Sequence, residues 1–161
     1  MRNLFAPWRK TYIGETRNKE RGCFICTAVN SDDDEKNLVV LRGQYAIVIV
    51  NKYPYNSGHV MVCPKRHIKF PYELNQEENL EIMDFIGRMV STLEKVYTPQ
   101  GFNLGANIGR YAGAGEEHLH FHIVPRWSGD TNFISVIGDT RVIPETVEDT
   151  YKKLKDALKE G

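Results

Sequence analysis

The chain has 161 residues, of which 41% are hydrophobic and 26% charged, and its 21 Lys and Arg residues balance its 21 Asp and Glu residues. This length suits one domain with its own core, and the zero net charge argues against nonspecific binding to nucleic acid or to an anionic membrane. No apolar run approaches the roughly 20 residues of a membrane helix, no signal peptide is visible, and an odd number of cysteines fits a reducing compartment, so we expect a cytoplasmic protein.

The first part of the chain is predicted to contain three strands. Residues 1–30 show no regular pattern apart from a Cys-x-x-Cys pair. Runs rich in β-branched residues at 38–41 and 44–51 predict two strands. Residues 53–58 have turn chemistry, and residues 59–63 (HVMVC) predict the third strand.

A long helix should follow, beginning at Asn75. Glu78 lies three residues later, which is typical of a capping box. Pro99 and Gly101 end the helix. Its apolar face repeats at helical spacing through Ile82, Ile86, Met89, Leu93 and Val96.

Two further strands are predicted at 102–108 and 118–124, and a second helix starts near Pro144. The apolar face of this helix consists of Val147, Tyr151, Leu154 and Leu158. No internal repeat or linker interrupts the chain, so we expect one domain over residues 1–161. Five short strands with a long helix after the third predict an α+β fold with an antiparallel sheet.

Three histidines alternate in the last predicted strand. Since alternate side chains of a strand share a face, His118, His120 and His122 should line one face, opposite the apolar Leu119 and Phe121. Three interpretations are open: a solvated polar face, a metal site, or a nucleophile.

A glycine-rich segment precedes these histidines. Its glycines are Gly101, Gly105, Gly109, Gly113 and Gly115. Glycine lets the backbone approach a ligand and turn its N–H groups toward an anion. A flexible loop is the simpler interpretation, but beside three histidines we favour a phosphate cradle. Neutral imidazole can attack phosphorus and form a covalent phosphohistidine.

The sequence HLHFHIV at 118–124 resembles the histidine triad motif of the HIT superfamily. The resemblance extends to NKYPYNSGHVMVCPKRHI at 51–68 and to LGANIGRYAGAG in the glycine loop, and covers residues 22–127. The flanks, LFAPWRKTYI and VPRWSGDTNF, look like those of bacterial diadenosine tetraphosphate phosphorylases and hydrolases. Residues 1–21 would then be an N-terminal extension and 128–161 a C-terminal extension with its helix.

The resemblance implies a fold and an activity. The fold is a five-stranded antiparallel sheet with two helices, continued across a homodimer. The activity is cleavage of dinucleoside polyphosphates through a covalent nucleotidyl-histidine intermediate. His120 would be the nucleophile, His122 would hold phosphate oxygens or assist the leaving group, and His59 would orient the triad that His118 begins.

It also implies substrate contacts. Asn51 matches a residue near the ribose, and Asn107 matches a side chain that contacts phosphate. Gly113 and Gly115 belong to the loop that would bind phosphate through backbone N–H groups. Trp127 could stack on a base, although a packing role is equally compatible with the sequence.

The Cys-x-x-Cys pair has three interpretations: two ordinary thiols, a redox motif, or half of a zinc site. In HIT-like enzymes that keep this pair, two histidines complete a Cys2His2 site. Here these would be Cys23, Cys26, His67 and His118, and the zinc would be structural.

Three other functions stay open. A nucleoside phosphoramidase would act on mononucleotide amides, whereas the small Ala114–Gly115 pair leaves room for a second nucleotide. A nucleotide sensor with little turnover is suggested by Glu116 and Glu117, which would repel a polyphosphate. The last is a metallohydrolase with three-histidine ligation.

Overall fold

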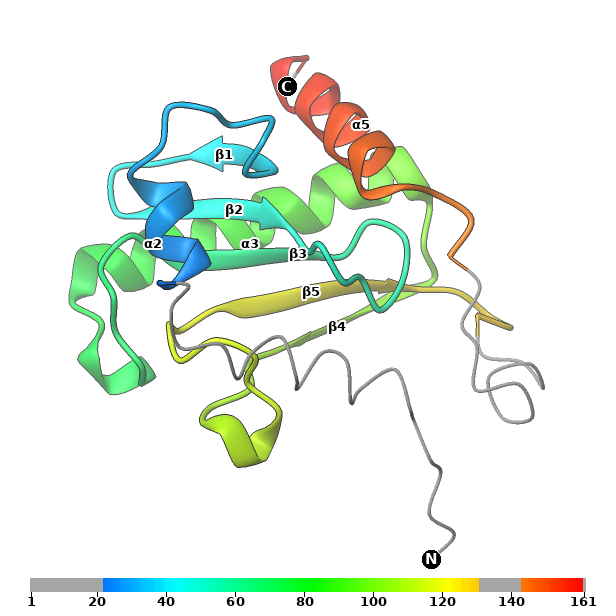
Figure 1. The fold of residues 1–161 in the computed structure, drawn as a ribbon. Coiled ribbons are helices and arrows are strands. Elements are labelled where there is room, and N and C mark those ends of the chain that lie inside the picture. Colours follow the sequence, from blue (N-terminus) through cyan, green and yellow to red (C-terminus); the bar gives the residue numbers. More distant parts are fainter. Residues whose placement is uncertain (1–21, 131–142, 161) are drawn as a thin grey trace, which may run out of the picture.

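The computed structural model describes residues 22–130 and 143–160. The predicted extension at 1–21 therefore lies outside the described residues, as does part of the C-terminal extension. Five strands form one antiparallel sheet in the order β1-β2-β3-β5-β4 (Figure 1). The strands are β1 Val39–Arg42, β2 Ala46–Val50, β3 Val60–Pro64, β4 Gly101–Gly105 and β5 Phe121–Arg126. The predicted α+β fold with a five-stranded antiparallel sheet is confirmed.

Helices cover both faces of this sheet. The long helix α3 (Gln76–Tyr97) and the C-terminal helix α5 (Val147–Lys159) pack on one face, and the short helix α2 (Phe24–Val29) packs on the other (Figure 1). Every residue of β2 is consequently buried, as its unbroken apolar run requires. Among the described residues, no helix is both long and apolar enough to cross a bilayer.

Each helix begins at a recognisable cap. The predicted capping box of α3 is present, since the Asn75 side chain accepts from the Glu78 N–H and the Glu78 side chain accepts from the Asn75 N–H. Helix α5 begins at Val147 behind the cap Thr146, slightly later than expected. The prediction that residues 1–30 are irregular was wrong at α2, whose first turn is capped by the Cys23 sulfur, an acceptor that propensity rules overlook.

Two strand boundaries also differ from prediction. The strand expected at 102–108 ends at Gly105, and the one expected at 118–124 begins at Phe121. Strand β4 ends at Gly105, which is paired with His122 at the last rung of the β4–β5 ladder, whereas β5 begins one residue before His122, at Phe121, the register partner of Val62 in β3. Before Phe121 the chain lies outside the sheet, and the Leu119 N–H donates to the Ile68 carbonyl at 2.7 Å.

A carboxylate from α3 closes the turn between β1 and β2. The Glu81 side chain accepts the backbone N–H groups of Gln44, Tyr45 and Ala46 at 2.9, 2.5 and 2.6 Å. This close approach explains Gly43, because a Cβ there would lie 2.5 Å from the Glu81 carboxyl carbon. The helix and the hairpin are thus joined by a charged cap as well as by packing.

Candidate active site and metal centre

The site lies on the sheet face that α2 covers. His122 is the register partner of Met61, which belongs to the apolar cluster under α2. Phe121 and Ile123 pack into the core beneath α3 and α5. The predicted alternation of histidine and apolar residues is therefore present in the β5 strand itself.

Hydrogen bonds define the tautomers of two of these imidazoles. The Tyr55 backbone N–H donates to His59 Nδ1 at 3.0 Å, so the proton of neutral His59 resides on Nε2. This N–H donates to His122 Nδ1 at 2.9 Å. His122 must then carry its own proton on Nε2, a buried atom that has no partner among the described residues. A buried donor without a partner calls for an explanation, and a ligand oxygen is one candidate acceptor for it.

The neighbouring imidazole, that of His120, carries its proton on the other ring nitrogen, Nδ1. His120 Nδ1 lies 2.6 Å from the His118 carbonyl oxygen, and because a carbonyl only accepts, Nδ1 carries the proton. His120 Nε2 is left with its lone pair. The rings of His120 and His122 lie 4.8 Å apart, edge to face, so a nucleophilic nitrogen and a proton donor adjoin each other.

Burial keeps the rings of His59, His118 and His122 neutral at neutral pH. It lowers the pKa of His59 to about 3 and that of His122 to about 4, with smaller contributions from neighbouring imidazoles. Burial likewise lowers the pKa of His118 to about 4. At neutral pH these three imidazoles hold one proton each, as the hydrogen-bond pattern requires.

His118 points away from the other two histidines. Its Nε2–H donates to the Pro64 carbonyl at 2.8 Å, and its Nδ1 lies 3.4 Å from the Cys23 sulfur and 3.5 Å from the Cys26 sulfur. His67 Nδ1 lies 3.2 Å from the Cys26 sulfur. His118 precedes β5, which begins at Phe121, but its ring contacts the cysteines of α2, the helix that covers the same sheet face. It joins the cysteine cluster instead of the rings of His120 and His122, and this arrangement disfavours three-histidine ligation.

The sulfurs of Cys23 and Cys26 and the Nδ1 atoms of His67 and His118 lie close enough together to coordinate one metal ion tetrahedrally. All lie within 4.8 Å of one another, and zinc bonds of about 2.0–2.3 Å place tetrahedral ligands about 3.3–3.8 Å apart. Burial raises the pKa of Cys23 to about 12, so this sulfur needs a bound cation to ionise. The described residues thus include a Cys2His2 cluster compatible with a metal.

The predicted substrate residues lie in three places. Asn51 adjoins His59, with its Nδ2 3.4 Å from His59 Nε2. Asn107 and Gly113 lie together in the glycine loop, where a Gly113 Cβ would come within 3.9 Å of the Asn107 amide nitrogen. Gly113 has φ +93°, a conformation that favours glycine, and Gly115 is partly buried in the same segment. Trp127 lies elsewhere, in a cleft of about 350 Å³ beside Tyr97.

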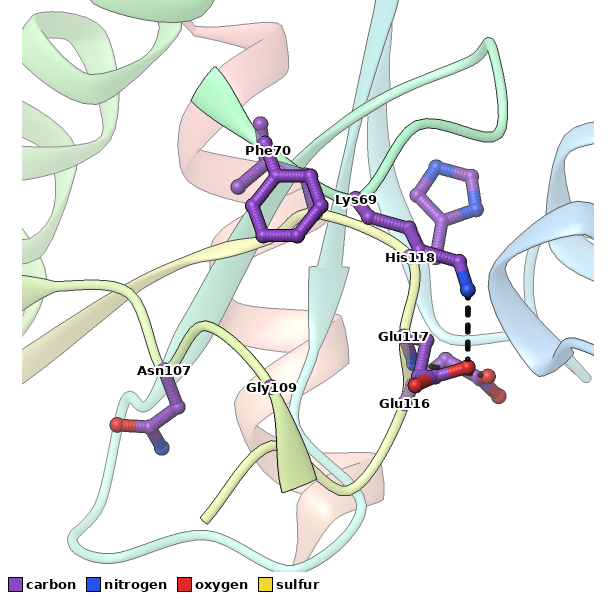
Figure 2. Close-up of a pocket in the computed structure, with 8 residues that line it drawn as sticks. Lys69, Phe70, Asn107, Gly109, Glu116, Glu117 and His118 are labelled. Carbon is purple, nitrogen blue, oxygen red and sulfur yellow. Dashed lines mark hydrogen bonds and ion pairs between the residues drawn. The ribbon is translucent and has the colours of Figure 1, made fainter. Parts of the chain in front are cut away.

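A hollow next to the glycine loop contains two residues that sequence reasoning missed. Figure 2 shows Lys69 and Phe70 across from Asn107, with Glu116 and Glu117 on the third side. The Lys69 ammonium lies 3.2 Å from the Glu117 carboxylate. No motif marks Lys69 or Phe70, and their only sequence signal is that they follow the metal-ligand candidate His67.

Comparisons with known proteins identify the family of the chain. Residues 33–129 match the model of the HIT domain family. The AP-4-A phosphorylase of Mycobacterium tuberculosis (strain CDC 1551 / Oshkosh) is 38% identical over 161 residues, covering 96% of this chain and 83% of that protein. The bis(5'-adenosyl)-triphosphatase of Dictyostelium discoideum is 34% identical over 83 residues, covering 52% of this chain and 56% of that protein. The chain belongs to the HIT family.

Solved structures show the same fold. A Zn-bound histidine triad family protein from Mycobacterium smegmatis superposes with a TM-score of 0.69 at 24% identity, covering 86% of this chain and 94% of that one. A uridylyltransferase superposes with a TM-score of 0.70 at 20% identity, covering 98% of this chain and 52% of that one. At these identities the likeness concerns the fold alone.

Proposed function

We propose that this protein cleaves dinucleoside polyphosphates, of the diadenosine tetraphosphate type, through a nucleotidyl-His120 intermediate. The observation that carries the proposal is the pair of adjacent, oppositely protonated imidazoles: His120 offers a lone pair on Nε2, and His122 offers a buried N–H without a partner among the described residues. Two relatives whose names denote enzymes acting on such substrates support the substrate class.

The reaction has two steps. His120 Nε2 attacks the innermost phosphorus of one nucleotide, an N–P bond forms, and the bond from phosphorus to the bridging oxygen breaks with its electron pair on the departing nucleotide. The His122 N–H donates to a phosphate oxygen and stabilises the developing charge. A second acceptor, water or inorganic phosphate, then attacks the same phosphorus and releases His120.

Other residues would bind the substrate. Since Tyr53 N–H holds the Asn51 amide oxygen at 2.9 Å and His59 Nε2 already carries a proton, the Asn51 NH₂ group is directed toward a ligand such as ribose. Asn107 would contact phosphate, with the backbone N–H groups of Gly113 and Gly115. Trp127 is retained as a candidate base contact from its cleft.

We also propose a structural zinc ion held by Cys23, Cys26, His67 and His118. It would fix the start of α2 to the segment before β5. Cys2His2 sites are closed, so the ion would take no part in the reaction. Homodimer formation through the edge strand β4 is a further proposal, supported by Leu104, whose side chain is 53% exposed there, and the protein is expected to act in the cytoplasm.

The activity is tested with His120→Asn and labelled diadenosine tetraphosphate. We expect the wild type to form an acid-labile adenylyl adduct and to release ATP, with AMP in water or ADP when inorganic phosphate is added. The His120→Asn variant should form no adduct. As the matched control, His122→Asn should turn over more slowly yet still be labelled at His120; equal rates for the wild type and His120→Asn would exclude the mechanism.

A further inference from the structure

An exposed aromatic ring, that of Phe70, lines the hollow described above, and the ring of Tyr72 stacks on it. Phe70 is 38% exposed and Tyr72 is 81% exposed, and the two rings stack with centroids 5.2 Å apart and planes inclined by 7°. Phe70 faces the hollow (Figure 2). A water-exposed aromatic surface beside a substrate loop is suited to stacking on a planar ligand.

Hydrogen bonds hold the backbone at Phe70 in place relative to the triad segment. The Glu73 carboxylate accepts the backbone N–H groups of Lys69 and Phe70 at 2.9 and 2.7 Å. The preceding residue, Ile68, accepts the Leu119 N–H at 2.7 Å, and Leu119 directly precedes the proposed nucleophile. The hollow is therefore preorganised with respect to the reaction centre.

The charges of the hollow suit a base better than a phosphate. Glu116 and Glu117 contribute two carboxylates, whereas the single ammonium, that of Lys69, is already paired with Glu117. Carboxylates repel phosphate oxygens but accept hydrogen bonds from exocyclic amino groups of nucleobases. An aromatic face with carboxylate acceptors beside it matches an amino-bearing base.

The roles proposed above for Asn51 and Asn107 put this hollow on the leaving-group side, because Asn107 lines the hollow and Asn51 lies beyond His122. From His118, which lines the hollow, the chain runs to His122 and the neighbouring Asn51. With one nucleoside at the Asn51 end, the phosphates pass the glycine loop at Asn107 and Gly109. The far end of the substrate then reaches the hollow.

We propose that the base of the departing nucleotide binds at the mouth of this hollow, whose own volume is only about 40 Å³, with the base stacked on the exposed ring of Phe70 and its amino group at the carboxylates of Glu116 and Glu117. This inference rests on the proposed function and adds to it a second base site. The site would make the enzyme prefer substrates that carry an amino-bearing base at both ends.

The first test compares diadenosine tetraphosphate with adenosine 5′-tetraphosphate, which has the same phosphate chain but no second nucleoside. Because stacking on one aromatic ring contributes about 5- to 150-fold per base, Phe70→Ala should lower kcat/KM for the dinucleotide by about 5-fold or more and leave the mononucleoside substrate within about 2-fold. The control Leu80→Ala, at a 64% exposed apolar residue of α3, should change neither. Equal losses on both substrates, or none, would overturn the proposal.

The second test changes the base. The ratio of kcat/KM between a dinucleotide and its matching mononucleoside tetraphosphate measures the contribution of the second base. We expect a larger ratio for adenosine than for inosine, whose base has no exocyclic amino group, and equal ratios in a Glu116→Ala, Glu117→Ala double variant, which lacks both acceptors. Equal ratios in the wild type would show that the carboxylates of Glu116 and Glu117 do not recognise the amino group of the base.

A binding measurement separates this proposal from the activity on which it rests. Calorimetry with His120→Asn, which lacks the nucleophile, should show tighter binding of the dinucleotide than of the mononucleoside tetraphosphate, and adding Phe70→Ala should abolish the difference. If the dinucleotide still bound more tightly than the mononucleoside tetraphosphate but the wild type did not cleave it, the proposed activity would be contradicted and the base site would not. If the wild type cleaved the dinucleotide but the two ligands bound equally well, the base site would be contradicted and the activity would not.

Discussion

Single main-chain groups decide which nitrogen carries the proton in His59 and in His120. The Tyr55 N–H directs the proton of His59 to Nε2, and the His118 carbonyl holds the proton of His120 on Nδ1. The proposed roles of donor and nucleophile thus follow from the backbone, whereas burial keeps the rings of His59 and His122 neutral. Protonation of a buried ring would remove an acceptor and place a charge in the fold.

The free energy of unfolding should therefore decrease in mild acid. His59 has an ordinary pKa of 6.5 in the unfolded chain and about 3 in the fold. The unfolded state binds the proton first, so the contribution of this ring is fully present above pH 6.5 and is lost as the pH falls toward 3.

Urea unfolding at several pH values measures this loss. For His59 alone it should amount to about 2 kcal/mol between about pH 7.5 and about pH 5. The variant His59→Gln should show a correspondingly flatter dependence. Parallel pH profiles for the two proteins would contradict the assignment of a neutral, buried His59.

At the scale of elements, the hairpin of β1 and β2 depends on α3. One carboxylate, that of Glu81, caps three successive N–H groups of the turn. Charge-assisted hydrogen bonds of this kind are stronger than neutral ones, and the turn has no room for a side chain at Gly43. The position of the hairpin is consequently coupled to the presence of the helix.

Replacing Glu81 by Gln should destabilise the protein by about 2 kcal/mol or more, since the amide has one acceptor and directs its NH₂ group at N–H donors. The matched control is Glu77→Gln, an exposed residue of the same helix, which should stay within about 0.5 kcal/mol. Chemical unfolding of both variants provides the comparison, and an equal effect of the two substitutions would show that the three hydrogen bonds contribute little.

At the scale of the whole molecule, the Cys2His2 cluster joins segments that are far apart in the sequence. Cys23 lies 95 residues from His118, and Cys26 lies 41 residues from His67. An ion bound to the folded state alone would stabilise all of these connections together.

We expect one zinc per chain by elemental analysis, and a fall in Tm of about 4 °C or more when the zinc is chelated or Cys26 is replaced by Ser, since about 1 kcal/mol shifts Tm by about 2–4 °C at this size. Cys63→Ala is the matched control. This thiol is buried in the core beneath α2 and lies outside the cluster, so the variant should lose stability yet keep its zinc. Metal-free protein with an unchanged Tm would exclude the ion.

Much of the fold was predictable because its signals are local. The β-branched run of β2 and the Asn75–Glu78 box of α3 each specify their element without reference to distant residues. The alternation in β5 likewise predicted the face of His122. What could not be predicted depends on contacts between distant segments: the direction of His118 depends on Cys23 and on the Pro64 carbonyl, and no spacing rule identifies Phe70.

His118 serves two neighbours through different atoms, its ring toward the cysteines and its carbonyl toward the ring of His120. A substitution of this side chain therefore changes the proposed metal ligands while leaving the peptide oxygen in the chain. Two noncovalent contacts, Cys26 with the His118 ring and the His118 carbonyl with the His120 ring, connect the cysteines to the proposed nucleophile. The rate of cleavage by variants of Cys23 and Cys26 would therefore measure how rigidly His120 must be held.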